Sequence, residues 1–133
     1  MTTIIKNSLL FLATTLFIAC GGKEQPEAVY ESERGETAEL SMSEKLKLGE
    51  KIFTGKGNCT TCHMADKKLI GPSIQDIVKG YDANGADLDA FLRGKANAII
   101  EPAQFPMMEA NLTITKKLSA VEMESLIAYM RSL

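Results

Sequence analysis

The five residues CTTCH, at positions 59 to 63, constrain this chain more than any other stretch of it. They place Cys59 and Cys62 three positions apart, and His63, the single histidine of the 133 residues, follows at once. Two thiols and an imidazole this close in sequence can serve as a redox dithiol, as part of a zinc site, or as an attachment point for haem. The fold around the motif must be compatible with one of these three functions.

The surroundings of the motif favour haem attachment. A structural zinc site uses four Cys or His ligands, and a carboxylate would have to complete the set here because the third cysteine, Cys20, is remote in sequence. A thioredoxin-type dithiol follows a β-strand, whereas a glycine-rich loop precedes Cys59. Haem attachment needs two thiols that add across the vinyl groups and an imidazole that reaches the iron from the same face, and C-x-x-C-H supplies both. Chance would place this pattern in a chain of this composition only about 0.0005 times.

Residues 1–19 have the pattern of an export signal. Lys6 precedes the uncharged stretch LLFLATTLFIA, whose eleven residues at ~1.5 Å each span roughly half of a ~30 Å hydrocarbon core. Small residues then surround Cys20, as in a bacterial lipoprotein signal, where the cysteine becomes the lipidated N-terminus. We expect Cys20 to anchor the protein in a bacterial membrane. The alternative is a cleaved secretory signal in which this cysteine is incidental.

Residues 20–40 have the composition of a flexible tether, and residues 41–133 have that of a folded domain. The tether carries six glutamates, opposed by Lys23 and Arg34, and its sparse apolar residues cannot offset the entropy cost of ordering. The formal net charge of the whole chain is −2 and no basic patch stands out. We therefore expect no nucleic acid partner.

The domain shows the spacing of short helices joined by irregular loops, without the sustained two-residue alternation of strands. A first helix is expected over residues 42–53, where apolar side chains recur one turn apart. Ser41 or Ser43 is suited to cap it, and the glycine-rich residues 55–58 end it. The predicted class is all-α.

Three further helices complete this prediction. Short ones are expected over residues 73–80 and 87–94, each bounded by a glycine. The last helix begins after the capping-box pattern of Ser119 and Glu122. The apolar residues that follow at helical spacing are Met123, Leu126, Ile127 and Met130. We assign the two methionines among them to the core.

Residues 42–133 resemble a class I monohaem cytochrome c in the order of their motifs. That family has a first helix with a glycine and an aromatic residue one turn later, then CxxCH, a Gly-Pro pair, a methionine loop and a last helix with an aromatic residue. The corresponding residues here are Gly49, Phe53, Cys59, Cys62, His63, Gly71, Pro72, Met108 and Tyr129. The resemblance implies a cytochrome c fold of short helices and loops around one covalently bound haem c. It also implies that Gly49 and Phe53 pack against the last helix near Tyr129.

The resemblance assigns roles to the attachment motif. Cys59 and Cys62 would hold the haem through thioether bonds, and His63 would be an axial ligand of the iron. The backbone carbonyl of Pro72 would accept a hydrogen bond from the ring of His63. Such a bond fixes the imidazole tautomer and raises the basicity of the ligating nitrogen.

The second axial ligand has to come from another part of the chain. A second histidine of the same chain is excluded, because the sequence has only one. The segment FPMMEAN, residues 105–111, is expected to be a loop between helices and contains both Met107 and Met108. The resemblance favours Met108, whose following residues Glu-Ala-Asn fit the family's methionine motif better, and Met107 is the alternative.

Histidine–methionine ligation leaves no open position on the iron, which suits single-electron transfer rather than bond-making. We therefore expect an electron carrier rather than an enzyme, placed in the periplasm and exchanging electrons with respiratory protein partners. One alternative is a haem enzyme or gas sensor with a displaced methionine, and another is a subunit docked permanently on one reductase or oxidase. Lys67 and Lys68 either steer an acidic partner or form an ordinary solvated surface.

Overall fold

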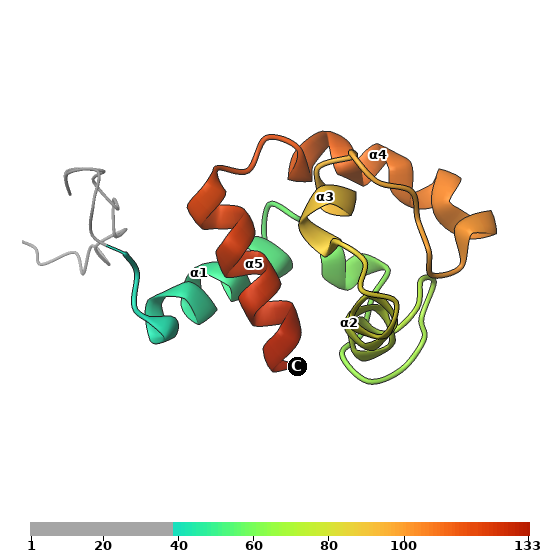
Figure 1. The fold of residues 1–133 in the computed structure, drawn as a ribbon. Coiled ribbons are helices and arrows are strands. Elements are labelled where there is room, and N and C mark those ends of the chain that lie inside the picture. Colours follow the sequence, from blue (N-terminus) through green and yellow to red (C-terminus); the bar gives the residue numbers. More distant parts are fainter. Residues whose placement is uncertain (1–38) are drawn as a thin grey trace, which may run out of the picture. The chain divides into compact units, whose positions relative to one another are not determined.

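The computed structural model describes residues 39–133, and in this part of the chain five α-helices and two short 3-10 helices form the fold (Figure 1). The elements in order are α1 (Met42–Thr54), η1 (Cys59–Thr61), α2 (Ile74–Ala83), α3 (Leu88–Leu92), η2 (Pro102–Gln104), α4 (Phe105–Thr115) and α5 (Ala120–Ser132). The β pairing among these residues is a single isolated bridge between His63 and Lys68. The all-α prediction is confirmed.

The predicted export signal and Cys20 lie outside the described residues, as does the predicted tether up to residue 38. Of the helices that the structure describes, none has both the length and the apolar character needed to cross a membrane.

The two longest helices begin with the same reciprocal cap. At the start of α1, Ser41 Oγ accepts from the Glu44 amide at 3.3 Å, and the Glu44 carboxylate accepts from the Ser41 amide at 3.0 Å. At the start of α5, the matching distances between Ser119 and Glu122 are 3.2 Å and 2.9 Å. Each cap satisfies amides that the first helical turn leaves without an intrahelical partner. The capping box predicted at Ser119 and Glu122 is confirmed, and of the two serines proposed to cap α1 it is Ser41 that does so. The reciprocal bond from Glu44 was not predicted.

Helices α1 and α5 cross at very close range, and Figure 1 shows them side by side. A Cβ atom added to Gly49 would lie 2.1 Å from the Ser125 carbonyl oxygen and 2.6 Å from the Tyr129 Cβ, so only glycine fits at this crossing. One turn on, the rings of Phe53 and Tyr129 pack with centroids 5.5 Å apart. The contact expected between the first and last helices is confirmed, and it explains a glycine that would otherwise cost the helix about 1 kcal/mol.

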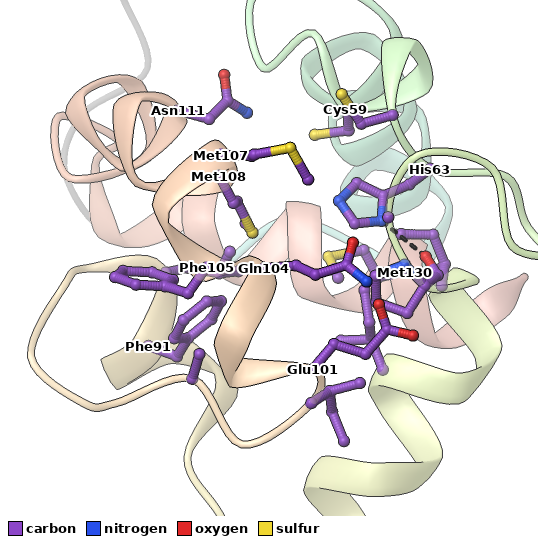
Figure 2. Close-up of a pocket in the computed structure, with 18 of the residues that line it drawn as sticks. Cys59, His63, Phe91, Glu101, Gln104, Phe105, Met107, Met108, Asn111 and Met130 are labelled. Atoms are coloured by element: carbon purple, nitrogen blue, oxygen red, sulfur yellow. Dashed lines mark hydrogen bonds between the residues drawn. The ribbon is translucent and has the colours of Figure 1, made fainter.

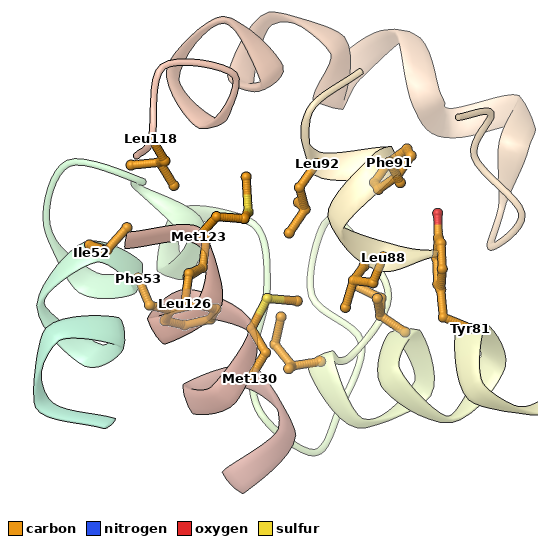
Figure 3. Close-up of a cluster of buried hydrophobic side chains, with 12 residues drawn as sticks. Ile52, Phe53, Tyr81, Leu88, Phe91, Leu92, Leu118, Met123, Leu126 and Met130 are labelled. Carbon is orange, nitrogen blue, oxygen red and sulfur yellow. The ribbon is translucent and has the colours of Figure 1, made fainter. Parts of the chain in front are cut away.

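The core lies between α1, α2, α3 and α5, and Figure 3 shows the side chains of α5 directed into it. Met123 and Met130 of α5 are 0% and 6% exposed, which confirms that they are core residues. The other buried apolar residues of the cluster are Ile52, Phe53, Ile74, Ile77, Tyr81, Leu88, Phe91, Leu92, Leu118 and Leu126.

Helices α2 and α3 begin as predicted, but α2 ends later. Ser73 and Asp87 are their N-caps, each accepting a hydrogen bond from an amide in the first turn. Gly80 was expected to end α2, yet the helix continues to Ala83. An added Cβ at Gly80 would lie 2.3 Å from Cδ1 of Ile100, so this glycine makes room for a side chain from a distant loop.

The prediction that residues 105–111 form a loop is wrong, because they make up most of α4. Pro106 occupies the first helical turn, where its missing amide N–H has no intrahelical bond to make. The residues that follow it, Met-Met-Glu-Ala, all have high helix propensity. Proline therefore starts this helix instead of preventing it.

Candidate functional site

A cavity of about 410 Å³ opens beside the core, between the CTTCH turn and α4 (Figure 2). Its volume lies within the range of ~300–1,000 Å³ that is usual for small-molecule and cofactor sites. Helices α2, α3 and α5 contribute apolar side chains to its lining, among them Ile77, Phe91 and Met130. The cavity is therefore largely apolar, with a few polar groups at defined places.

The CTTCH turn forms one wall. The short helix η1 closes through two backbone hydrogen bonds to the Cys59 carbonyl, from the Cys62 amide at 3.1 Å and from the His63 amide at 2.9 Å. This tight turn places both thiols and the imidazole along the cavity, where all three side chains are partly buried. The two cysteines are free thiols rather than a disulfide pair.

The Cys59 thiol lies in the drier part of this wall. Burial raises its pKa to about 11, and the neighbouring Cys62 adds to the rise while the backbone at Cys59 partly opposes it. The thiol is therefore neutral near pH 7, which fits a group in an apolar cavity better than it fits an exposed thiolate nucleophile.

The backbone of Gly71 and Pro72 holds the imidazole in place. Nδ1 of His63 lies 2.7 Å from the Pro72 carbonyl oxygen, and because a carbonyl only accepts, Nδ1 carries the proton. A Cβ atom on Gly71 would lie 2.5 Å from Cε1 of the same ring, so glycine is required where the loop passes the imidazole. Nε2 is thus left with a free lone pair, and Figure 2 shows the ring projecting toward the methionines across the cavity.

Residues 101–111, which we call the methionine wall, form the opposite side of the cavity. Met107 and Met108 both line it from the start of α4, and Figure 2 shows both side chains entering it. They differ in burial, since Met107 is 65% exposed while Met108 is half-buried and packs against the core. The structure thus brings both candidate methionines to face His63.

Two buried polar atoms on the cavity lining lack a partner among the described residues. They are the Tyr81 hydroxyl and Oε2 of Glu101, whose other carboxylate oxygen accepts from Lys68 Nζ at 2.6 Å. Burial raises the pKa of Tyr81, and the Ile99 backbone opposes this only in part, without reaching hydrogen-bond geometry with the hydroxyl. Buried polar groups in proteins are nearly always bonded, so these atoms indicate that the cavity receives a molecule with polar groups of its own.

Sequence reasoning missed several of these lining residues. The sequence could have identified Tyr81, because it lies on the apolar stripe of α2 one turn after Ile77. Glu101 gave no signal, since its left-handed backbone (φ 47°) and its approach to the cavity arise from the loop before η2. Asn111 was read only as part of a motif, yet its Nδ2 donates to the Gly57 carbonyl at 2.9 Å.

Together these features suit a haem. The thiols could attach its vinyl groups, the imidazole and a thioether lie on opposite sides, and apolar rings surround the space between them. The unpartnered Tyr81 hydroxyl could bond to a polar edge of the group. Within residues 39–133, no three or more His, Cys, Asp and Glu side chains gather in a way that could bind a bare metal ion.

Comparison with known proteins agrees with this geometry. A family model described as "Cytochrome c" matches residues 46–133. A cytochrome c-551 of Pseudomonas denitrificans is 46% identical over 37 residues, which cover 28% of this chain and 44% of that protein. A cytochrome c-551 of Azotobacter vinelandii is 35% identical over 60 residues, which cover 44% of this chain and 72% of that protein. The chain thus spans less than half of the first relative and about seven tenths of the second.

Proposed function

Because this chain belongs to the cytochrome c family, whose haem c is covalently bound, we propose that it is an exported bacterial carrier of single electrons. The observation that carries the proposal is the placing of a free imidazole nitrogen and a thioether on opposite sides of one apolar cavity. When bound there, haem supplies an iron that changes oxidation state by one electron. The chain would supply both ligands of the iron and a water-poor environment.

The CTTCH turn and the Gly71–Pro72 backbone beside it have separate proposed roles. Cys59 and Cys62 would hold the haem through thioether bonds, and Nε2 of His63 would bind the iron. The Pro72 carbonyl keeps the proton on Nδ1, which leaves Nε2 available as a ligand and makes it more basic. Gly71 supports this by letting the loop lie flat against the ring.

Met108 is the proposed second axial ligand. Its half-buried side chain packs against the core, so α4 and the core limit where its sulfur can go. Met107, which is 65% exposed, is the alternative. A thioether is a soft ligand that favours ferrous iron and raises the reduction potential.

An iron with both axial positions occupied has none open to a substrate, which supports a carrier rather than an enzyme or a gas sensor. The proposed partners are redox proteins of a respiratory chain, met either in passing or as a permanently docked complex. Lys67 is exposed in the loop after CTTCH, whereas Lys68 is already paired with Glu101. Lys67 is therefore the better candidate of the two for steering an acidic partner.

The proposed location is the periplasmic side of a bacterial membrane. The export pattern of residues 1–19 and the small residues around Cys20 support a lipid anchor at that cysteine. Mass spectrometry of the mature protein should find acyl groups on an N-terminal Cys20, and membranes should retain the protein until Cys20→Ser releases it. A soluble wild-type protein whose N-terminus lies elsewhere would contradict the anchor alone.

The haem ligation is tested by optical spectra of the matured protein. The oxidised wild type should show a methionine-to-iron charge-transfer band, and acidified acetone should not extract the pigment. Met108→Leu should abolish the band and open the reduced iron to carbon monoxide, whereas the matched variant Met107→Leu should retain the wild-type spectrum. If Met107→Leu alone loses the band, the ligand is Met107. If the wild type lacks the band, histidine–methionine ligation is wrong.

A further inference from the structure

The hydrogen bond between Asn111 and Gly57 joins the two walls of the cavity. Asn111 lies three residues after Met108 on α4, so both side chains occupy the same face of that helix. Its Nδ2 donates at 2.9 Å to the carbonyl of Gly57, which is 54 positions away in sequence and two residues before Cys59. A single amide thus connects the helix that carries the methionines to the segment that carries the thiols.

The Gly57 carbonyl has few other possible partners. Gly57 is buried, and the other side chain that bonds to its carbonyl is the Cys59 thiol, which donates at 3.5 Å. A thioether has no S–H, so Cys59 cannot make this bond once it holds a haem. In the haem-bound protein Asn111 is then the side-chain donor that remains to satisfy a buried carbonyl.

The opposite end of α4 is held separately. Thr115 Oγ1 donates to the Leu92 carbonyl of α3 at 2.6 Å, in a fully buried position. Thr115 lies seven residues, about two turns, beyond Met108, whereas Asn111 is within one turn of it. The two hydrogen bonds therefore fasten α4 at different distances from the proposed ligand.

We propose that Asn111 is a positioning residue that holds α4 closed over the cavity and so limits how often the axial methionine leaves the iron. This inference rests on the proposed function, because it requires a methionine ligand on α4. Without the amide, the Gly57 carbonyl would be buried without a donor, and opening α4 to admit water would relieve that cost. The open state would then be populated more often, which leaves the iron accessible to an external ligand.

The test compares two single substitutions in the full-length matured holoprotein. Asn111→Asp keeps the size of the side chain but replaces a donor with a carboxylate that cannot donate to Gly57. Thr115→Val is the matched control, since it removes the other hydrogen bond of α4 with almost no change of shape. We measure the rate at which the reduced protein binds carbon monoxide, together with the charge-transfer band and the unfolding temperature.

Asn111→Asp should raise the carbon monoxide binding rate about tenfold, the factor expected for one buried hydrogen bond, and weaken the charge-transfer band. Thr115→Val should lower the unfolding temperature but change the rate by less than about twofold. Asn111→Gln, which retains the amide donor, should recover most of the wild-type rate. If Asn111→Asp does not yield holoprotein, Asn111→Ala removes the donor with a good helix former.

Equal rates in the Asn111 and Thr115 variants, or a wild-type rate once the amide donor is removed, would overturn the inference. Either result leaves the proposed function standing, provided that the wild type shows the charge-transfer band. A wild type without that band overturns the proposed ligation and the role of Asn111 together.

Discussion

The α1–α5 crossing and the methionine wall differ in how completely their side chains are packed against other parts of the protein. At the crossing, Gly49 lies against the backbone of α5, and the rings of Phe53 and Tyr129 pack together. The buried Lys45 donates to Glu124 at 2.6 Å and also pairs with Glu39 at 3.4 Å. Among the buried side-chain polar atoms of this crossing in the described residues, the hydroxyl of Ser125 lacks a hydrogen bond.

The methionine wall, in contrast, faces a cavity rather than another helix. Oε2 of Glu101 is buried without a partner, as is the hydroxyl of Tyr81 across the cavity, and Met107 is 65% exposed. Two side-chain hydrogen bonds, from Asn111 and Thr115, fasten α4 to the rest of the domain. Each region thus has one buried polar atom without a partner, and they differ instead in packing: α1 and α5 fill their crossing with their own atoms, whereas the methionine wall lines a cavity.

Removal of the covalent haem should have the largest effect and should act mainly on the methionine wall. The double substitution Cys59→Ser and Cys62→Ser removes both attachment points, so the wall loses the group that its side chains surround. We expect fast hydrogen exchange throughout α4. Amides of α1 and α5 should keep measurable protection, because Gly49 and Tyr129 pack protein against protein at their crossing, although Phe53 also lines the cavity. The measurement is hydrogen exchange followed by mass spectrometry on the full chain.

Cys20→Ser is the control for this experiment, since it removes a cysteine but no attachment point and should leave the pigment bound. If α1 and α5 exchange as fast as α4 in the double variant, the two regions form one cooperative unit and the distinction between them is wrong.

Gly49→Ala should destabilise the crossing without changing the site. Its Cβ would lie 2.1 Å from the Ser125 carbonyl oxygen, so the helices must separate. The expected loss is about 2 kcal/mol in the free energy of unfolding, after the helix propensity gained by alanine is taken into account. Guanidinium unfolding measures the loss, and the absorption spectrum should stay unchanged. The exposed neighbour Lys47→Ala should change stability by less than about 0.5 kcal/mol.

In contrast to Gly49→Ala, the substitution Gly71→Ala should change the proposed haem site more than the stability of the fold. The new Cβ would lie 2.5 Å from Cε1 of His63, which forces the ring or the loop to move and disturbs the bond to Pro72. We expect a loss of about 1 kcal/mol in stability together with a lower midpoint potential, since a displaced imidazole is a poorer match for the iron. Potentiometric titrations of the Gly71→Ala and Gly49→Ala proteins measure and compare their midpoint potentials. A spectrum and potential identical to those of the wild type would show that the Gly71 contact does not position the ligand.

The smallest effect concerns acid stability at the start of α5. The ion pair with Lys56 lowers the pKa of Glu122 below its usual 4.5, and the Ser119 amide in the capping box adds to the shift. Stability from the ionised carboxylate is therefore complete above about pH 4.5 and is lost as the pH falls through the lower folded-state pKa. Because the pair is partly exposed, the loss should stay below about 1 kcal/mol. Unfolding curves of the wild type and Glu122→Gln between pH 7 and pH 3 should converge at the acid end, and parallel curves would contradict the assignment.

Much of the scaffold and the attachment turn could be predicted from sequence. The Ser-x-x-Glu caps, the apolar stripe of α5 and the CTTCH turn all depend on residues within about four positions of one another, so their signals lie together in the chain. Gly49 could be interpreted because a glycine inside a helix points to a close crossing.

The errors lie where distant segments meet. The sequence predicts that Gly80 ends α2, because no residue near Gly80 in sequence indicates that the side chain of Ile100 packs against it. Residues 105–111 were predicted to form a loop between helices, but they belong to α4, whose first turn tolerates Pro106. The partners of Asn111 and Glu101 could not be foreseen, because Gly57 is 54 residues from the first and Lys68 is 33 from the second.

The sequence by itself predicted haem attachment at the CTTCH motif and determined the helical class and the starts of the longest helices. Thiol spacing, capping and apolar periodicity all act over one or two turns, so their signals are local. Only the tertiary structure decided which groups face one another across the cavity: His63 opposite the methionines, Asn111 on Gly57, and two polar atoms without protein partners. Those placements depend on how helices pack, and packing is a property of the whole folded chain rather than of any short segment.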